Sequence, residues 1–334
     1  MTGHLCYPVA MRYLRQTSHD PATNLAFEEA VFALAEEESL ILWRNGPSVI
    51  LGRNQNAYEE LDFRFVEEHG IRVARRISGG GAVFHDLGNI NYTVITCNDG
   101  DAFGNYERFT RPVREYLKTL GVHAECVGRN DLCVDGMKVS GGAQAVRGGR
   151  ILHHGTLLFN ADLSRLAGAL KPHPAKMESR GIKSVRSRVT NIADHFSSAM
   201  GVEEFLEGLE QHFLRDGARK AAPSDAELRK ADELRINKYD TFAWTIGESP
   251  KCTFSRTQRL ECGTLTFSTV LSGGMMGRVR LTGDFFGVRD VAELEGRLNG
   301  VRYSRDAIER ALEGCTVEET IAGLEARRLV EVII

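Results

Sequence analysis

Short apolar runs in the first part of the chain alternate with amphipathic stretches, which predicts strands separated by helices. The predicted strands are Met11–Gln16, Leu40–Trp43, Ser48–Leu51, Ile71–Arg75 and Asn91–Thr96. Three helices are predicted. The first begins at Asp20-Pro21 and has an apolar stripe of Leu25, Phe27, Ala30, Val31 and Leu34. The other two are roughly Asp62–His69 and Asn105–Leu120. Proline at the first helical position and glycine after the last are typical helix boundaries, and Pro21, Gly70 and Gly121 stand at such places.

The region from Val122 to Phe159 has the pattern of a β meander. Asp135-Gly136 and Gly148-Gly149 stand between apolar runs and predict two-residue hairpin turns. Two predicted helices, around Val202–Leu214 and Asp225–Leu234, follow. Antiparallel strands with helices between and after them predict an α+β fold with a large mixed or antiparallel sheet, not a parallel doubly wound sheet.

The sequence pattern changes near Tyr239–Gly247. Phe254–Phe286 predicts a run of short strands with glycine turns. Three short helical patterns follow, at about Asp290–Leu298, Ser304–Leu312 and Val317–Ala326. We therefore predict two domains, residues 1–247 and a smaller α+β domain of residues 248–334.

Composition and charge exclude several classes of protein. The 334 residues are 42% hydrophobic and 26% charged, as in soluble globular proteins. Forty-two basic against forty-five acidic residues argue against nucleic acid as the main ligand. No apolar run approaches the ~20 residues that cross a membrane, and the N-terminus lacks the pattern of a secretory signal. Seven scattered cysteines without a CxxC pair indicate reduced thiols, so we expect a cytoplasmic protein without structural zinc.

Three consecutive glycines after two arginines form the most informative motif, Arg75-Arg76-Ile77-Ser78-Gly79-Gly80-Gly81-Ala82-Val83-Phe84-His85-Asp86. Glycine lacks a Cβ, so this loop can bring backbone N–H groups against an anion, and the arginines can hold carboxylate or phosphate oxygens. The motif has neither the Gly-Lys-Ser/Thr of a P-loop nor the spacing of a Rossmann turn. A tight hairpin turn is the simpler alternative for this motif taken alone.

A second set of motifs follows about fifty residues later. It comprises GRNDL at 128–132, KVSGGAQ at 138–144, HHGTLLFNADLSRL at 153–166 and KSVRSRVTN at 183–191. Together with RRISGGGAVFHDLGNINY at 75–92, these motifs resemble the lipoate–protein ligases in order and spacing, from about Asn24 to Asn191 and weakly beyond. Gly142 departs slightly, because relatives often carry a larger or polar residue there.

The resemblance implies a fold of the biotin/lipoate ligase type and an ATP-dependent activity. Such ligases convert lipoate and ATP to lipoyl-AMP and transfer the lipoyl group to a lysine of lipoyl domains. The acceptors are the E2 subunits of 2-oxoacid dehydrogenases and the glycine-cleavage H protein. The chemistry-bearing motifs all lie before the C-terminal domain, so we expect this domain to change position between the two steps. Its presence in the same chain also leads us to expect an enzyme that needs no accessory protein, and we expect a monomer.

Adenylation brings a carboxylate and a phosphate together, so it needs a cation between them. By resemblance Lys138, which follows a hairpin turn and precedes Ser140-Gly141-Gly142, is the catalytic residue. The implied ATP-binding residues are Arg76, Gly81, Ala82, Val83, Phe84, Asn130 and Lys138. The implied lipoate-binding residues are Arg76, Ser78, His85, Lys138, Gly155 and Trp43. Core packing is an equally valid interpretation for Trp43, and it is compatible with ligand binding for Val83 and Phe84.

Asp131 is the carboxylate closest to Lys138 across the predicted hairpin, and it is our candidate for one ligand of Mg²⁺. A plain turn pair of Asn130 and Asp131 is the alternative. His153 and His154 are adjacent on a predicted strand and must point to opposite faces, so we do not expect a shared metal ion. Both are expected to shape the pocket, one pointing inward and one outward.

Lys171–Asn191 is strongly basic, with six lysines and arginines against Glu178 alone. A solvated charged face is one interpretation. The other is a loop that closes over the adenylate and excludes water, and that attracts acidic lipoyl domains.

Three alternative functions are open at this point. One is an octanoyl or lipoyl transferase of the same fold, acting without ATP through Cys133 or Cys126. Cys133 falls inside a strand pattern and lacks a flanking histidine that could activate it, and the glycine motif and the C-terminal domain favour the ligase. The second is a biotin ligase, and the third is a non-enzymatic lipoate-binding protein, against which Lys138 argues.

Overall fold

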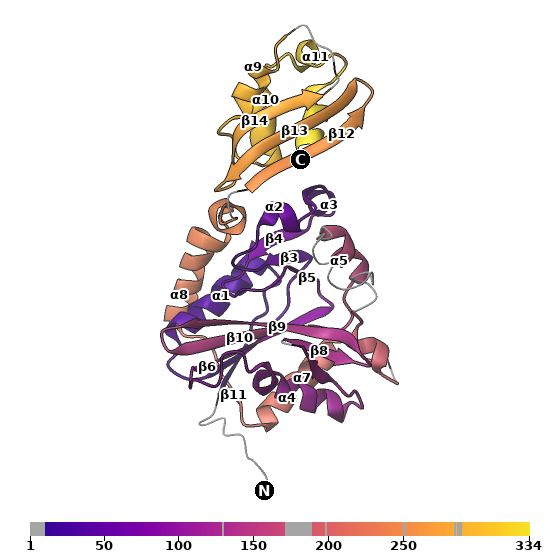
Figure 1. Ribbon diagram of the computed structural model, residues 1–334. Helices are drawn as coiled ribbons and strands as arrows, with labels where there is room; N and C mark the ends of the chain where they lie inside the picture. Colours follow the sequence, from indigo (N-terminus) through magenta and orange to yellow (C-terminus); the bar gives the residue numbers. More distant parts are fainter. Residues whose placement is uncertain are drawn as a thin grey trace. The chain divides into compact units, whose positions relative to one another are not determined.

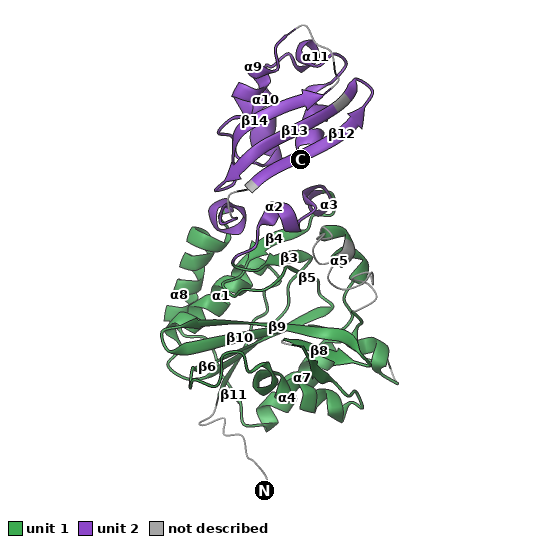
Figure 2. Ribbon diagram, in the orientation of Figure 1, with its two compact units in different colours: residues 1–53, 68–241 green, residues 54–67, 242–334 purple. Residues whose placement is uncertain are grey.

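The computed structural model describes residues 11–128, 130–170, 189–197, 199–249, 252–283, 285 and 289–334. The chain divides into two compact units (Figure 2). Unit 1 contains the chain up to Arg53 and Glu68–Thr241, and unit 2 contains Asn54–Glu67 and Phe242–Ile334. A short internal segment therefore belongs with the C-terminal part, which the sequence pattern did not suggest. The predicted domain boundary after Gly247 stays a prediction.

An eight-stranded mixed sheet is the main element of unit 1 (Figure 1). Its order is β11 (Arg219–Lys220), β1 (Arg12–Arg15), β2 (Ser39–Trp43), β6 (Asn89–Cys97), β10 (Arg150–Leu158), β9 (Met137–Arg147), β8 (Asp131–Val134) and β7 (Glu125–Val127). β1 pairs in parallel with β2 and β11, and the other neighbours are antiparallel. The predicted α+β class with a large mixed sheet is confirmed.

A three-stranded sheet in unit 1 frames the glycine motif. β3 (Ser48–Leu51) lies between β4 (Arg72–Arg75), its parallel neighbour, and β5 (Val83–His85), its antiparallel neighbour. β4 leads into the glycine loop and β5 leaves it. The loop therefore crosses the end of β3, which fixes both of its ends.

The large sheet is covered on both faces, and the side chains alternate between them. Leu40 and Leu42 of β2 and Tyr92 and Val94 of β6 join the main core with α4 (Tyr106–Thr119) and α7 (Val202–Arg215). The alternate positions, Trp43 and Asn91, line a cavity on the other face. Figure 1 shows α4 and α7 on one side of the sheet, with α1 (Pro21–Leu34) and the small sheet on the other.

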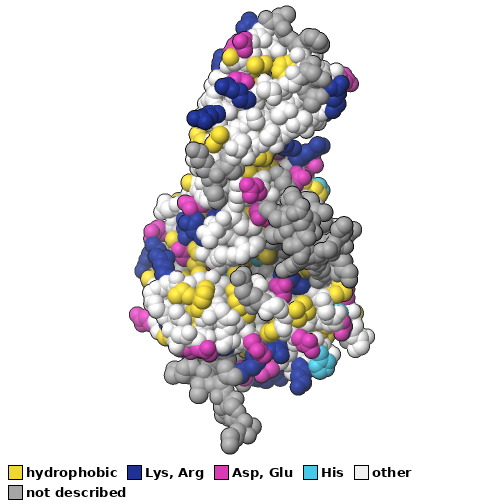
Figure 3. All heavy atoms as spheres, in the orientation of Figure 1, with side chains coloured by type: hydrophobic (Ala, Val, Ile, Leu, Met, Phe, Trp, Pro, Cys, Tyr) yellow, Lys and Arg dark blue, Asp and Glu magenta, His cyan; other side chains and the backbone are white. Residues whose placement is uncertain are grey.

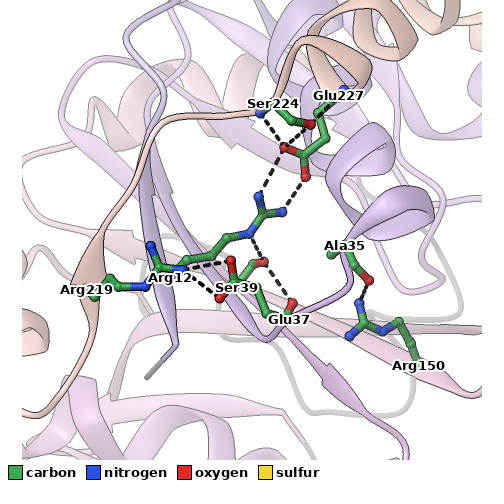
Figure 4. A network of polar contacts seen from close by, with 8 residues as sticks. All are labelled: Arg12, Ala35, Glu37, Ser39, Arg150, Arg219, Ser224 and Glu227. Atoms are coloured by element: carbon green, nitrogen blue, oxygen red, sulfur yellow. Dashed lines mark hydrogen bonds and ion pairs between the residues drawn. The ribbon is translucent and has the colours of Figure 1, made fainter. Parts of the chain in front are cut away.

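α8 (Asp225–Leu234) is attached to the sheet by a buried charge pair (Figure 4). The Arg12 guanidinium on β1 binds both carboxylate oxygens of Glu227 and donates from Nε to Ser39 Oγ at 2.7 Å. Glu227 also closes a capping box with Ser224 at the start of α8. Breaking one partner of such a buried pair typically costs about 3–5 kcal/mol, so this contact fixes the helix that leads toward residue 241.

Unit 2 is a three-stranded antiparallel sheet with helices packed on it. The elements are β12 (Cys252–Leu260), β13 (Gly263–Ser272), β14 (Met275–Gly283), α9 (Ala292–Leu298), α10 (Arg305–Leu312), α11 (Val317–Thr320) and α12 (Ala326–Ile333). Two short helices, α2 (Ala57–Glu60) and α3 (Phe63–Glu68), come from the internal segment and its end. Leu265, Phe267, Ile308 and Leu329 are fully buried in this unit.

Most of the predicted elements are present, with some corrections. The helices predicted at Asn105–Leu120 and Asp225–Leu234 are confirmed as α4 and α8. The predicted helix Val317–Ala326 is wrong: α11 ends at Thr320, Gly323 has φ +79°, and α12 begins at Ala326. The strands predicted to be short in Phe254–Phe286 are nine to ten residues long. Local pattern did not reveal α2, α5 (Leu163–Ala169) or the π-helical turns η3 (Arg235–Tyr239) and η4 (Ala243–Gly247).

The surface carries charges of both signs. On the face drawn in Figure 3, Lys and Arg side chains are interspersed with Asp and Glu among the residues that are coloured. Among the described helices, none is long and apolar enough to cross a membrane.

Candidate active site

A cavity of about 150 Å³ lies between the glycine loop and the face of β9 and β10 that carries His154. Its lining comes from the glycine loop and β5 (Gly80, Gly81, Ala82, Val83, His85), from β9 and β10 (Lys138, Gly141, Gly142, Ala143, His154, Gly155, Thr156), and from Leu25, Trp43, Ile50, Arg76, Asn91 and Asn130. Nine residues singled out from the sequence therefore meet here. They are Trp43, Arg76, Gly81, Ala82, Val83, His85, Asn130, Lys138 and Gly155.

Lys138 stands near the start of β9, directly after the hairpin turn at Asp135-Gly136. Its ammonium lies 2.6 Å from Asp131 Oδ1, and both side chains are about one-third exposed. A Cβ on Gly141 would fall 2.9 Å from Lys138 Nζ, so the end of the lysine side chain lies directly over the Gly141 backbone. The Lys138 carbonyl accepts from Thr190 N at 3.0 Å, which fixes the backbone while the ammonium stays at the cavity.

Arg76 is a very different cation, because its donors are used by the glycine loop itself. Its Nη2 donates to the carbonyls of Gly79 and Gly81 at 2.7 and 2.9 Å, Nη1 donates to Ile50 O, and Nε donates to Ser78 Oγ. Burial lowers the pKa of Arg76 to about 10, which still leaves it charged at neutral pH. In this structure Arg76 organises the loop, and direct ligand binding by Arg76 stays a prediction.

The glycine loop is also fitted closely to Gly52. A Cβ on Gly52 would lie 2.0 Å from the Gly80 carbonyl oxygen, so a side chain at residue 52 would displace the loop. Gly80 itself has φ +95°, a conformation that strains other residues. Arg53 N donates to Ser78 O at 2.8 Å. The loop's path is therefore defined by backbone contacts that require glycine at 52 and 80.

Buried polar groups form a chain that includes two residues of the cavity wall, Trp43 and His154. We call this chain the buried relay: Ser78, His154, Glu28, Thr93 and Trp43. Ser78 Oγ lies 2.6 Å from His154 Nε2, and His154 Nδ1 lies 2.9 and 3.1 Å from the Glu28 oxygens. Trp43 Nε1 donates to Thr93 Oγ1 at 3.0 Å, and Thr93 donates to Glu28 at 2.5 Å. Because a carboxylate only accepts, the Nδ1 proton of His154 points at Glu28, and in the neutral ring Nε2 accepts from Ser78.

His85 offers the cavity an N–H donor. Burial, with Arg76 and His154 nearby, lowers the pKa of His85 to about 3, so the ring is neutral. Its Nδ1 lies 3.1 Å from Asn45 Nδ2, an amide donor, which places the ring proton on Nε2. Nε2 is buried and has no hydrogen-bond partner among the described residues. A buried unpaired donor in a cavity wall suits an oxygen of a bound molecule.

His153 and His154 face opposite sides of the sheet, as the strand alternation predicted. His154 lines the cavity, whereas His153 stacks on Phe109 of α4 at 4.7 Å between ring centroids. His153 does not reach solvent, and burial lowers its pKa to about 3. Gly155 is required on that same side, since a Cβ there would fall 2.5 Å from the Tyr92 ring. A Cβ on Gly142 would lie 3.0 Å from His153 Cε1.

Three residues proposed from the sequence are not part of the lining. Phe84 is buried, 4% exposed, on β5, so its side chain is core while its backbone borders the loop. Ser78 is 1% exposed and takes part in the buried relay. Asp131 pairs with Lys138. Within the described residues, no group of three or more His, Cys, Asp or Glu side chains is arranged to hold a metal ion.

The basic segment Lys171–Arg188, which contains Lys171, Lys176, Arg180, Lys183, Arg186 and Arg188, lies outside the described residues. Its roles as a lid and as a docking element stay predictions.

Two family models match the chain. Residues 20–214 match the lipoyl protein ligase A/B catalytic domain, and residues 249–333 match the bacterial lipoate protein ligase C-terminus. The sequence is 40% identical over 324 residues to the lipoate-protein ligase LplJ of Bacillus subtilis, covering 95% of this chain and 98% of that one. The chain belongs to the lipoate–protein ligase family.

Two solved structures of lipoate–protein ligases support the same assignment. A bipartite ligase of Thermoplasma acidophilum, described with its E2 lipoyl domain, superposes with a TM-score of 0.65 at 30% identity, covering 73% of this chain and 99% of that one. A lipoate-protein ligase A solved with ATP gives a TM-score of 0.63 at 29% identity, covering 72% and 100%. The family predicted from the motifs is confirmed.

Sequence reasoning missed Glu28 and Thr93 of the buried relay. Glu28 and Glu29 are both buried in α1, inside the apolar stripe of a helix where charged residues are rarely buried without a partner. Two adjacent glutamates in such a stripe were the available signal. The lipoate–protein ligase motifs do not include them, so the motif comparison could not identify them.

Proposed function

We propose that the protein is an ATP-dependent lipoate–protein ligase that makes lipoyl-AMP and transfers the lipoyl group to a lysine of lipoyl domains. The observation that carries the proposal is the position of Lys138, whose partly exposed ammonium borders the cavity and is paired with the carboxylate of Asp131. The solved ligase that holds ATP and the ligase described with its E2 lipoyl domain support both substrates by similarity.

In the first step an oxygen of the lipoate carboxylate attacks the α-phosphorus of ATP. The bond from α-phosphorus to the bridging oxygen breaks, and pyrophosphate leaves with that electron pair. Lys138 would leave Asp131 and lie between the two anions, which lowers their repulsion and stabilises the charge that develops on the phosphorus oxygens. A flexible ammonium suits this task, because it can follow the oxygens as the bond forms.

The glycine loop would hold the nucleotide phosphates. Gly81, Ala82 and Val83 line the cavity, so their backbone can approach an anion, and Phe84 would contribute its backbone only. Arg76 would support this loop and add positive charge from behind it. Asn130, whose side-chain amide donates to Gly142 O at 2.8 Å, would border the nucleotide.

Asp131 would hold Mg²⁺ once Lys138 has turned to the substrates. A single carboxylate fits this ion, which usually takes one or two protein carboxylates together with substrate phosphates and water. The ion would supply charge neutralisation for the leaving pyrophosphate.

The acyl group would occupy the part of the cavity lined by Trp43, His85 and Gly155. His85 Nε2–H and Ser78, if released by His154, would supply hydrogen-bond donors to the acid or its adenylate. The apolar face of Trp43, fixed by its bond to Thr93, would border the carbon chain.

In the second step the acceptor lysine attacks the carbonyl carbon of lipoyl-AMP, an amide bond forms and AMP leaves. We propose E2 subunits and the glycine-cleavage H protein as acceptors, a monomeric cytoplasmic enzyme, and a change in the position of the C-terminal domain between the steps. Cys133 is disfavoured as the nucleophile of the thiol transferase alternative, because it is buried, and burial and Asp131 raise its pKa.

The test is to incubate the protein with ATP, lipoate and an apo-lipoyl domain. The domain should gain the mass of one lipoyl group on its acceptor lysine, with one AMP and one pyrophosphate formed per transfer. Biotin in place of lipoate should give no product. Modification without AMP, from an octanoyl carrier protein, would establish the transferase instead.

A further inference from the structure

The segment Asn54–Glu67 lies between β3 and β4 in the sequence, yet it packs as part of unit 2 (Figure 2). We call it the inserted segment. Its Tyr58 ring lies 5.0 Å from Tyr303 and 6.3 Å from Phe254, measured between centroids. Phe63 lies 6.1 Å from Tyr303 and 5.6 Å from Tyr58. Four aromatic rings from three distant parts of the chain thus form one cluster.

Polar contacts reinforce this attachment at both ends of the inserted segment. Ala57 N donates to Ser249 Oγ at 3.0 Å. Arg305 Nε lies 2.8 Å from both carboxylate oxygens of Glu67. Tyr58 is 1% exposed and Tyr303 is 3% exposed, so the cluster is a true core. The inserted segment therefore moves with unit 2 whenever that core stays intact.

The residues immediately before the inserted segment define the glycine loop. Gly52 leaves no room for a side chain against the Gly80 carbonyl, and Arg53 N donates to Ser78 O at 2.8 Å. Arg75 Nη1 donates to Gly52 O and Arg53 O at 3.0 and 3.2 Å. Gly52 and Arg53, which contact the glycine loop, are joined to the inserted segment of unit 2 by a single peptide bond, from Arg53 to Asn54.

We propose that Tyr58 and Phe63 are positioning residues for the glycine loop. By holding the inserted segment in unit 2, they set the course of Gly52 and Arg53, and thereby the position of Ser78 and Gly80. Unit 2 then influences adenylation through the chain at Arg53–Asn54, besides its connection at Thr241–Phe242. The kinetic part of this proposal rests on the proposed ligase function, whereas the effect on the loop does not.

The test measures amide hydrogen exchange of residues 78–82 in the full chain without ligands. Tyr58→Ala should raise exchange in these amides by tenfold or more. Leu294→Ala is the control, since Leu294 is a buried apolar residue of unit 2 on α9, 1% exposed, and belongs neither to the inserted segment nor to the aromatic cluster. It should loosen unit 2 and leave exchange in the loop within twofold of wild type.

A second pair of variants, with smaller expected effects on stability, is used if either alanine variant fails to fold. Arg305→Gln breaks the contact with Glu67, whereas Arg289→Gln breaks the contact of Arg289 with Glu319, 2.5 Å away within unit 2. Only Arg305→Gln should raise loop exchange, by about two- to threefold, and only it should raise the KM for ATP with little change in kcat. Unchanged loop exchange in Tyr58→Ala and Arg305→Gln, or equal changes in the two members of a pair, would overturn the proposal. If the wild-type protein has no ligase activity but loop exchange still rises in Tyr58→Ala and Arg305→Gln, the positioning role of the inserted segment is upheld and the proposed ligase function is rejected.

Discussion

Two cations stand at the cavity, and they are built in opposite ways. Lys138 is about one-third exposed and, among the described residues, forms an ion pair with Asp131 alone. Arg76 is 6% exposed and makes four hydrogen bonds to the loop and to β3. The sequence placed both in the same role, as anion-binding side chains. The structure separates a cation that is available to react from one that maintains the architecture.

This difference predicts which property depends on each residue: stability on Arg76 and catalysis on Lys138. Removing Arg76 leaves buried carbonyls without donors, and the cost appears in folding. Removing Lys138 leaves a partly exposed carboxylate that water can solvate, and the cost should appear in catalysis alone.

The largest effect on stability is expected for Arg76→Lys. An ammonium cannot span the carbonyls of Ile50, Gly79 and Gly81, so buried acceptors lose their donors. The free energy of unfolding should fall by roughly 3 kcal/mol, at about 1–3 kcal/mol for each unsatisfied group. Urea unfolding measures this, with Arg72→Lys, a change at an exposed arginine, as the control. Wild-type stability in Arg76→Lys would remove the contrast between the two cations.

Gly80→Val should have the next largest effect. A β-branched residue at φ +95° is strained by about 1–3 kcal/mol, and its Cβ would lie 3.0 Å from Arg76 Nη2. We expect a folded protein with weakened binding of ATP and lipoate in calorimetric titrations. Gly79→Ala is the matched control, because a Cβ there meets nothing within 4 Å. Normal titrations for Gly80→Val would return the loop to a simple turn.

Acid should destabilise the protein through His85 and His153, whose pKa values are lowered to about 3 by burial. Between about pH 6.5, the pKa of an unfolded histidine, and pH 3, the unfolded state binds protons that the folded state does not. Stability is therefore present above pH 6.5 and is lost as the pH falls. The expected slope is about 1.4 kcal/mol per pH unit for each histidine in that window.

Unfolding in urea at several pH values between 6.5 and 5 tests this slope before most carboxylates titrate. His153→Phe removes one of the two titrating histidines, so the slope should fall by the contribution of one histidine. The fold should be retained, because a phenylalanine keeps the stacking contact that His153 makes with Phe109. A flat profile in the wild type would mean that these rings are protonated in the folded protein.

The sequence predicted the fold class and brought most of the cavity lining together, because glycine motifs and hairpin turns act locally. Asp135-Gly136 is one such case, with both residues at positive φ. The sequence could not distinguish the structural role of Arg76 from the exposed position of Lys138, because that difference arises from burial after folding. The buried relay was missed because Glu28, Thr93 and His154 meet only across three elements. The inserted segment was missed for the same reason: the partners of Tyr58 lie about 200 to 245 residues away.

The central claim is that Lys138 is the reacting cation, and Lys138→Ala tests it through the two half-reactions. The account predicts that pyrophosphate release from ATP and lipoate falls by roughly 10²–10³-fold, the scale for losing one preorganised donor. It also predicts that transfer from added lipoyl-AMP to the apo-lipoyl domain is at least partly retained. The free energy of unfolding should change by less than about 1 kcal/mol. Lys118→Ala, a change in the last turn of α4, serves as the control. Pyrophosphate release at the wild-type rate in Lys138→Ala would contradict the account.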